Sequence, residues 1–133
     1  AKAVEIAIDD MDAENKKYKK WTDTMLEKFS AVGGKLNGHL TNRLVHNLNI
    51  RFDGVQSKSI INTVSKKLAI SAGSACTSDL VEPSHVLLAL GLSEDQAHNS
   101  IRIGCNRFNT DEEIDFAISE ILNALESIAK IRV

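Results

Sequence analysis

Two stretches of helical periodicity, one toward each end of the chain, dominate the hydrophobic pattern. Across residues 1–30, apolar positions recur at three- and four-residue steps with acids and lysines between them, which predicts one long amphipathic helix. Toward the other end, Thr110 and Glu113 have the spacing of a capping box. The apolar residues that follow at the same steps are Ile114, Ile118, Ile121, Leu125 and Ile128. We therefore expect a second long helix that begins after Thr110.

Strand-like patterns lie between these two helices. Residues 44–52 place Leu44, Leu48 and Ile50 on one face and polar residues on the other, as in a half-buried strand. The Asp-Gly pair that follows predicts a turn. Residues 68–70 form a short apolar run typical of a buried strand, and the β-branched run 100–104 predicts another.

Three shorter helices are predicted from their end signals. Ser57 precedes an apolar-periodic run and is a candidate N-cap. Pro83 suits the first turn of a helix that Gly91 ends, and Ser93 with Gln96 has capping-box spacing. Helices and strands are mixed along the chain, without repeats or a linker. We expect a single α+β domain with two layers.

Composition narrows the class of protein. The chain has 133 residues, of which 43% are hydrophobic and 26% charged, as in folded water-soluble domains. Its formal net charge of −2 argues against direct nucleic-acid binding. No apolar run approaches the roughly 20 residues that span a bilayer, and no secretory signal is recognised. We expect no membrane association.

The segment 71–78 is the most unusual part of the sequence. It consists of small residues around one thiol: Ser71, Ala72, Gly73, Ser74, Ala75, Cys76, Thr77 and Ser78. Such a segment lacks the bulk of a core element, which predicts a loop. An accessible cysteine in a loop can act as a nucleophile once it is a thiolate. From composition alone, a reactive thiol and an inert small residue are equally good interpretations of Cys76.

Arg102 and Cys105 are the other residues considered for a chemical role. Arg102 stands between two isoleucines in a strand that is otherwise suited to burial, which implies a carboxylate partner from a ligand or from the protein. Both alternatives stay open. Cys105 follows the same strand and is interpreted as a buried, inert residue. Cys76, Cys105, His85 and His98 lack the spacing of metal ligands, so we expect no metal site.

Several segments resemble one known family. Residues 71–78 (SAGSACTS) and 82–92 (EPSHVLLALGL) resemble the active-cysteine loop of group I cysteine desulfurases of the NifS/IscS type, in the class V aminotransferase family. The resemblance continues through 97–103 and 107–115, and upstream through 47–52. It implies the two-layer small domain of the aspartate aminotransferase-like architecture, fold type I of the pyridoxal phosphate (PLP) enzymes.

The resemblance also implies a function. Such enzymes use PLP to remove sulfur from L-cysteine, which leaves alanine and a persulfide on the residue that matches Cys76. The sulfur goes to an iron–sulfur scaffold or another acceptor protein, or to tRNA thiolation. Arg102 matches the arginine that holds the substrate carboxylate. The matching active loop is Ser71, Gly73, Ser74, Ala75, Cys76, Thr77 and Ser78. A cytoplasmic homodimer is implied for the parent enzyme, with mitochondrion and plastid as alternative locations.

Some elements of the family pattern are missing from this chain. In the family, the lysine that binds the cofactor follows a histidine, and this sequence contains no His-Lys pair. We therefore expect residues 1–133 to be one domain without the large PLP domain, with 1–30 as the connecting helix and 31–133 as the small domain. Alone, the chain is expected to be inactive and to bind no PLP. The alternative is a freestanding sulfur or selenium carrier, or the docking half of a split desulfurase.

Overall fold

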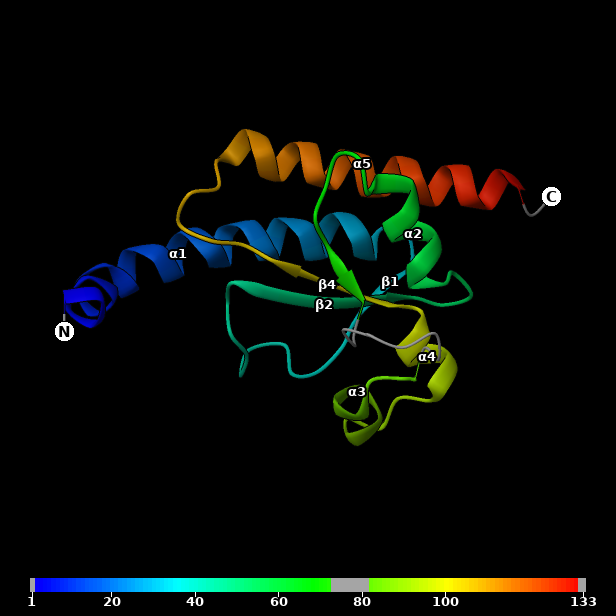
Figure 1. The fold of residues 1–133 in the computed structure, drawn as a ribbon, viewed down its shortest axis with the longest axis horizontal. Coiled ribbons are helices and arrows are strands. Elements are labelled where there is room, and N and C mark those ends of the chain that lie inside the picture. Colours follow the sequence, from blue (N-terminus) through cyan, green and yellow to red (C-terminus); the bar gives the residue numbers. More distant parts are fainter. Residues whose placement is uncertain (1, 73–81, 132–133) are drawn as a thin grey trace.

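A computed structural model describes residues 2–72 and 82–131 of the chain (Figure 1). The elements are α1 (Lys2–Ser30), β1 (Gly34–Leu36), β2 (Asn47–Phe52), α2 (Ser57–Val64), β3 (Ser71–Ala72), α3 (His85–Ala89), α4 (Glu94–His98), β4 (Ser100–Gly104) and α5 (Asp111–Ile131). The helices α1, α2 and α5 lie on one side of the strands, and α3 and α4 lie on the other side (Figure 1). The predicted α+β class, with a long helix toward each end, is confirmed.

The strands form an antiparallel sheet in the order β1-β2-β4-β3. In the central pair, Leu48 lies opposite Ile103 and Ile50 lies opposite Ile101. These four side chains are at most 5% exposed and belong to the core shared with the long helices. Successive side chains of a strand point to opposite faces. The residues between them therefore lie on the face turned away from the long helices.

The two long helices complete this core with the faces that the sequence pattern predicts. The buried residues of α1 begin at Tyr18 and end at Phe29, and those of α5 run from Ile114 to Ala124. The N-terminal part of α1 differs, because every residue from 2 to 13 is exposed. Within the described residues, the amphipathic pattern of α1 is thus used for packing only in its second half.

Two of the predicted strand boundaries are wrong. The strand β2 begins at Asn47 rather than at residue 44, because the Asn47 amide donates to the Leu44 carbonyl at 3.2 Å and closes a turn there. The run 68–70 is not a strand, since the Leu68 amide bonds to the Val64 carbonyl at 2.8 Å. The strand comes just afterwards, as β3. Leu68 and Ile70 instead pack against the core from an irregular segment.

Two predicted helix starts are also shifted. Ser57 is not the N-cap of α2, because Gln56 is the last residue with extended backbone and Ser57 already lies in the first turn. The helix α3 begins two residues after Pro83, with Ser84 as its N-cap. Its predicted end is confirmed, since Gly91 has a φ of +86° just beyond the helix. That backbone conformation strongly favours glycine.

Both predicted capping boxes are present. At the start of α4, the Gln96 amide donates to Ser93 Oγ at 3.2 Å, and the Ser93 amide donates to Gln96 Oε1 at 3.0 Å. At the start of α5, the Glu113 amide donates to Thr110 Oγ1 and the Thr110 amide donates to Glu113 Oε2, both at 3.2 Å. These reciprocal bonds satisfy donors that have no partner within the helix. Local sequence therefore decides where these two helices begin.

Candidate functional site

Arg102 lies on the face of β4 that is turned away from the long helices. Its cross-strand neighbours are Asn49 on β2 and Ser71 on β3. The residue is exposed, so the prediction of a buried arginine is wrong. Ile101 and Ile103 point into the core, and strand alternation places Arg102 on the opposite face. No ion-pair partner is found for Arg102 among residues 2–72 and 82–131.

Arg102 lines a pocket of about 270 Å³ on this outer face. Its walls come from β2, β4, α3 and the segment before β2. The described lining residues are Leu36, Asn37, Arg43, Leu44, Asn47, Asn49, Ser84, Val86, Leu87, Leu90 and Arg102. They include two guanidinium groups and no carboxylate. The charge of the lining therefore favours an anionic ligand, and a guanidinium binds a carboxylate or phosphate through paired hydrogen bonds.

The two arginines of the pocket are held differently. Arg43 Nη1 donates to the Asn47 carbonyl at 3.0 Å, Nε donates to the Leu40 carbonyl at 3.3 Å, and Nη2 donates to Thr22 Oγ1 at 3.3 Å. Arg43 therefore ties the segment before β2 to that strand and to α1. Arg102 makes no such bonds within the described part of the chain. Of the two, Arg102 has its donors available for a ligand.

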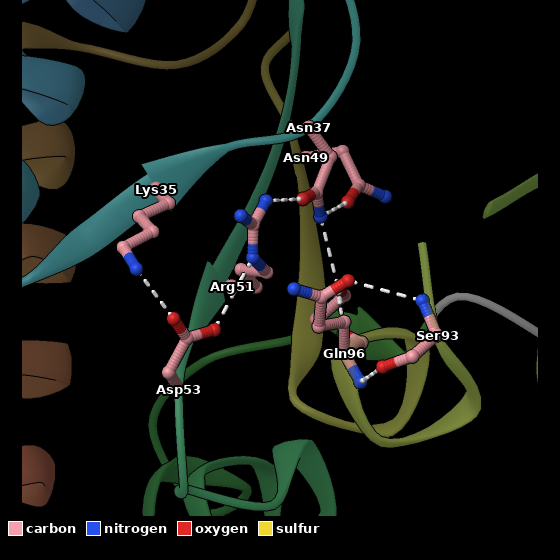
Figure 2. Close-up of polar contacts among 8 residues, drawn as sticks. Lys35, Asn37, Asn49, Arg51, Asp53, Ser93 and Gln96 are labelled. Atoms are coloured by element: carbon pink, nitrogen blue, oxygen red, sulfur yellow. Dashed lines mark hydrogen bonds and ion pairs between the residues drawn. The ribbon is translucent and has the colours of Figure 1, made fainter. Parts of the chain in front are cut away.

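A partly buried chain of hydrogen bonds adjoins the pocket (Figure 2). Arg51 Nη1 donates to Asn37 Oδ1 at 2.7 Å. Asn37 Nδ2 donates to Asn49 Oδ1 at 2.7 Å and to Ser100 Oγ at 2.8 Å, and the Ser100 hydroxyl donates to the Gln96 carbonyl at 2.7 Å. Asn37 is 7% exposed and Ser100 is fully buried. The network joins β2, α4 and β4 to the segment that follows β1, and therefore holds the outer face in one arrangement.

The far end of this network carries an ion pair. Asp53 Oδ2 accepts from Lys35 Nζ at 2.6 Å, and Asp53 Oδ1 accepts from Arg51 Nε at 3.2 Å (Figure 2). The hydrogen bond from Lys35, helped by the charges of Lys35 and Arg51, lowers the pKa of the Asp53 carboxyl. Sequence reasoning missed these residues. The available signal was the run of polar side chains at alternate positions 47, 49 and 51, which marks a polar sheet face.

Most of the predicted active loop lies outside the described residues. This applies to Gly73, Ser74, Ala75, Cys76, Thr77 and Ser78. Ser71 is described, and it forms part of β3 directly opposite Arg102. Beyond the undescribed segment, Ser84 and Val86 line the pocket. The chain thus enters and leaves this segment beside the candidate site.

Cys105 is buried, as predicted. Its side chain is 7% exposed, and burial raises the pKa of the thiol, which disfavours the reactive thiolate.

No group of three or more histidine, cysteine or acidic residues in the described ranges is arranged to hold a metal ion. Nor does any helix there combine the length and apolar character needed to cross a bilayer.

The pocket can be compared with what PLP requires. A PLP enzyme uses a lysine for the Schiff base and an acidic or arginine partner for the pyridinium nitrogen. The described lining contains no lysine for the Schiff base and no aromatic ring to stack on the pyridine. These residues do not fit the cofactor itself. They fit an anionic group of a ligand that approaches the outer face of the sheet.

Comparison with curated proteins identifies relatives. The profile of the family described as aminotransferase class-V matches residues 2–116. A protein named cysteine desulfurase IscS from Methylobacillus flagellatus is 46% identical over 117 residues, which are 87% of this chain and 29% of the relative. The protein of the same name from Ectopseudomonas mendocina is 41% identical over 130 residues, covering 97% of this chain and 32% of the relative. The chain therefore spans about a third of the length of these proteins.

Solved structures show the same fold. A NifS-like protein superposes with a TM-score of 0.80 at 24% identity, covering 94% of this chain and 32% of that one. A NifS-like protein from Rickettsia africae superposes with a TM-score of 0.73 at 22% identity, covering 89% and 31%. These likenesses confirm the predicted small-domain architecture of fold type I. With the family match over most of its length, this chain belongs to the class-V aminotransferase family.

Proposed function

We propose that this chain is the sulfur-accepting part of a cysteine desulfurase. Arg102 binds the carboxylate of L-cysteine, and Cys76 takes the sulfur. The observation that carries the proposal is the 41–46% identity to IscS proteins over 87–97% of the chain. The pocket supports it, because its exposed arginine has no carboxylate partner among the described residues.

The position of Arg102 suits recognition of an amino acid. A guanidinium presents donors in a planar fork that matches the two oxygens of a carboxylate. Arg102 presents this fork on the surface of a sheet whose other face is buried. The paired strand therefore holds the backbone of Arg102 in a fixed position. Apolar residues of α3, among them Val86, Leu87 and Leu90, border the same pocket. A small amino acid matches this combination of charge and apolar wall.

The position of Cys76 in the sequence suits sulfur transfer. It follows Ala72 by four residues, and Ala72 belongs to the strand that pairs with β4 beside Arg102. In the proposed transfer, the Cys76 thiolate bonds to the sulfur of L-cysteine as the substrate carbon–sulfur bond breaks. The electron pair of that bond stays on carbon, which takes up the substrate thiol proton. The products are alanine and a Cys76 persulfide, so atoms and charge balance.

The rest of the reaction belongs to residues beyond this chain. The relatives are about three times as long, and the described pocket lacks the groups that hold PLP. We propose that the large domain supplies the cofactor site, that 1–30 connects it to the small domain 31–133, and that the whole protein is a cytoplasmic homodimer. Iron–sulfur assembly and tRNA thiolation are the two candidate destinations of the sulfur.

Intact-mass analysis tests the sulfur acceptor. The chain is incubated with L-cysteine and PLP, with and without an intact IscS-type desulfurase. Without the added enzyme we expect no gain, because the described pocket lacks the groups that hold PLP. With the enzyme we expect a gain of one sulfur atom that dithiothreitol removes. The gain should disappear in Cys76→Ser and persist in Cys105→Ser, the matched control at the buried thiol. A gain only with the added enzyme fits both the sulfur-accepting part and a carrier, whereas a gain without it would overturn the expectation that the chain alone is inactive. No gain in either arm, or a gain that survives Cys76→Ser, would contradict the proposal.

A further inference from the structure

Asn49 on β2 lies directly opposite Arg102 in the register of the sheet, as Ser71 does on β3. Asn49 and Arg102 are paired across β2 and β4, on the same outer face. Directly opposite side chains of an antiparallel pair have Cβ atoms about 5 Å apart. Both residues line the 270 Å³ pocket, and Asn49 is only partly exposed. Any group bound by Arg102 over the sheet therefore comes within reach of the Asn49 side chain.

The orientation of the Asn49 amide follows from donor and acceptor rules. An arginine can only donate, so the Asn37 atom that contacts Arg51 Nη1 at 2.7 Å must be the oxygen. Asn37 then turns its NH₂ group toward Asn49 and Ser100. The Ser100 hydroxyl already donates to the Gln96 carbonyl, so its oxygen is free to accept.

Asn49 must therefore present its oxygen to Asn37 and its NH₂ group elsewhere. Figure 2 shows the Asn49 nitrogen pointing away from the network, with no dashed line to it. No described residue accepts from Asn49 Nδ2. The obligatory donor Arg51 thus sets the polarity of a second amide two bonds away. The result is an amide donor whose direction is fixed, beside a guanidinium whose donors are available.

We propose that Asn49 Nδ2 is a second donor to the substrate carboxylate beside Arg102, and that Arg51 is a positioning residue that keeps this donor turned outward. The proposal deepens the proposed function and rests on it. A carboxylate has two oxygens with about four acceptor sites, so it can take the arginine fork and one amide hydrogen bond together. Two donors on separate strands also fix the direction from which the carboxylate arrives.

The test measures binding without turnover. The ¹⁵N-labelled 133-residue chain is titrated with L-alanine, the amino-acid product of the proposed reaction, and the NMR signals of the Asn49 side-chain NH₂ and of Arg102 Nε–H are followed. We expect both to shift along one binding curve. Arg102→Ala should abolish binding. Asn49→Ala should weaken it about tenfold, as for one hydrogen bond to a charged group. Asn49→Asp should weaken it more, because the donor becomes a negative acceptor.

Matched variants separate the two claims. Asn62→Asp makes the same charge change on the exposed face of α2, away from the pocket, and should bind like the wild type. Arg51→Met removes the obligatory donor and should weaken binding, whereas Arg51→Lys keeps a donor and should rescue it. Because Arg51 also pairs with Asp53, Asp53→Asn is the second control. It should bind like the wild type, whereas a role of Arg51 through that ion pair alone would weaken binding in Asp53→Asn as well.

The outcomes distinguish two failures. Should Arg102→Ala abolish binding while Asn49→Ala and Asn49→Asp stay within about twofold of wild type, the inference about Asn49 is overturned and the carboxylate site stands. If Arg102→Ala binds like wild type, the carboxylate site itself is overturned. A variant that loses the dispersed amide spectrum of the folded chain is set aside. The wild-type titration then decides alone, because an Asn49 signal that does not move overturns the inference.

Discussion

The two faces of the sheet are formed by alternating residues of the same strands, yet one is packed with apolar side chains and the other carries polar ones. On the face toward α1 and α5, Leu48, Ile50 and Ile101 are fully buried against helix side chains. On the other face, the alternate positions carry amides and arginines. Their bonds run among themselves, from Arg51 through Asn37 to Asn49. The first face is stabilised by buried apolar area, whereas on the second each buried polar group needs a hydrogen-bond partner.

Arginines in different parts of the molecule differ in whether the described protein supplies a carboxylate partner. Arg107, in the segment between β4 and α5, donates to Glu14 at 2.9 Å and to Asp10 at 3.4 Å on α1. Arg51 pairs with Asp53. Arg102 has no carboxylate among the described residues, although it stands on the same sheet face as Arg51. Where the protein supplies the counterion, an arginine is structural. Arg43 is structural as well, through carbonyl and hydroxyl acceptors, whereas the donors of Arg102 stay available for the ligand proposed above.

The largest expected effect is on the helix-covered face. Ile50→Ala should lower the free energy of unfolding by about 2–5 kcal/mol, because it leaves a cavity in a fully buried cluster. Urea unfolding followed by circular dichroism measures this change. Asn47→Ala, in the same strand but on the outer face, is the matched control and should change stability far less. Equal losses would contradict the division between the two faces.

The next effect concerns the buried network. Asn37→Ala removes one amide that bonds to Arg51, Asn49 and Ser100, and it leaves the fully buried Ser100 oxygen without its donor. We expect a loss of about 2 kcal/mol, since an unsatisfied buried polar group costs about 1–3 kcal/mol. Asn42→Ala, at an exposed position, controls for loss of an amide alone. Unchanged urea midpoints for Asn37→Ala would show that the network adds nothing to stability.

A smaller effect is expected at the contact between α1 and the start of α5. Arg107→Ala should cost at most about 1 kcal/mol, because partly exposed ion pairs contribute little. The difference from wild type should shrink as salt is added, since salt screens these charges. Urea unfolding at low and high salt measures it. A loss that does not depend on salt would indicate that Arg107 acts through packing instead.

Lowering the pH should slightly reduce the contribution of the Asp53 ion pairs to the free energy of unfolding. The folded-state pKa of Asp53 lies below its ordinary value of 3.8, with the bond from Lys35 as the main cause. Its contribution is therefore present above pH 3.8 and is lost as the pH falls through the lower folded-state pKa. Asp53→Asn should flatten this part of the acid-unfolding curve. The exposed Asp23→Asn, in an ion pair within α1, is the control, and an unchanged Asp53→Asn curve would refute the assignment.

The smallest effect on stability is expected at the site itself. Arg102→Ala should change the free energy of unfolding by less than about 0.5 kcal/mol, because an exposed side chain without a described partner stabilises little. The same variant should nevertheless lose carboxylate binding. Urea unfolding measures the first quantity, and a clear loss there would mean that Arg102 has a structural partner.

The sequence by itself determined the elements whose signals are local. The apolar spacing of α1 and α5 predicts both helices, and the two capping boxes mark where α4 and α5 begin. These features depend on residues three or four positions apart, and their physics is complete within one turn of helix. The β-branched run likewise predicts β4 with its observed ends.

Only the tertiary structure decided which face of a strand is covered and which partners its polar residues meet. Flanking isoleucines made Arg102 look buried, but burial depends on helices distant in sequence. Asn37 meets Ser100 across 63 positions and Asn49 across 12, and neither contact has a local signature. Hydrophobic periodicity assigns a side chain to a face, because a strand has only two. Whether that face is packed, paired or left open for a ligand depends on contacts that form only when the chain folds.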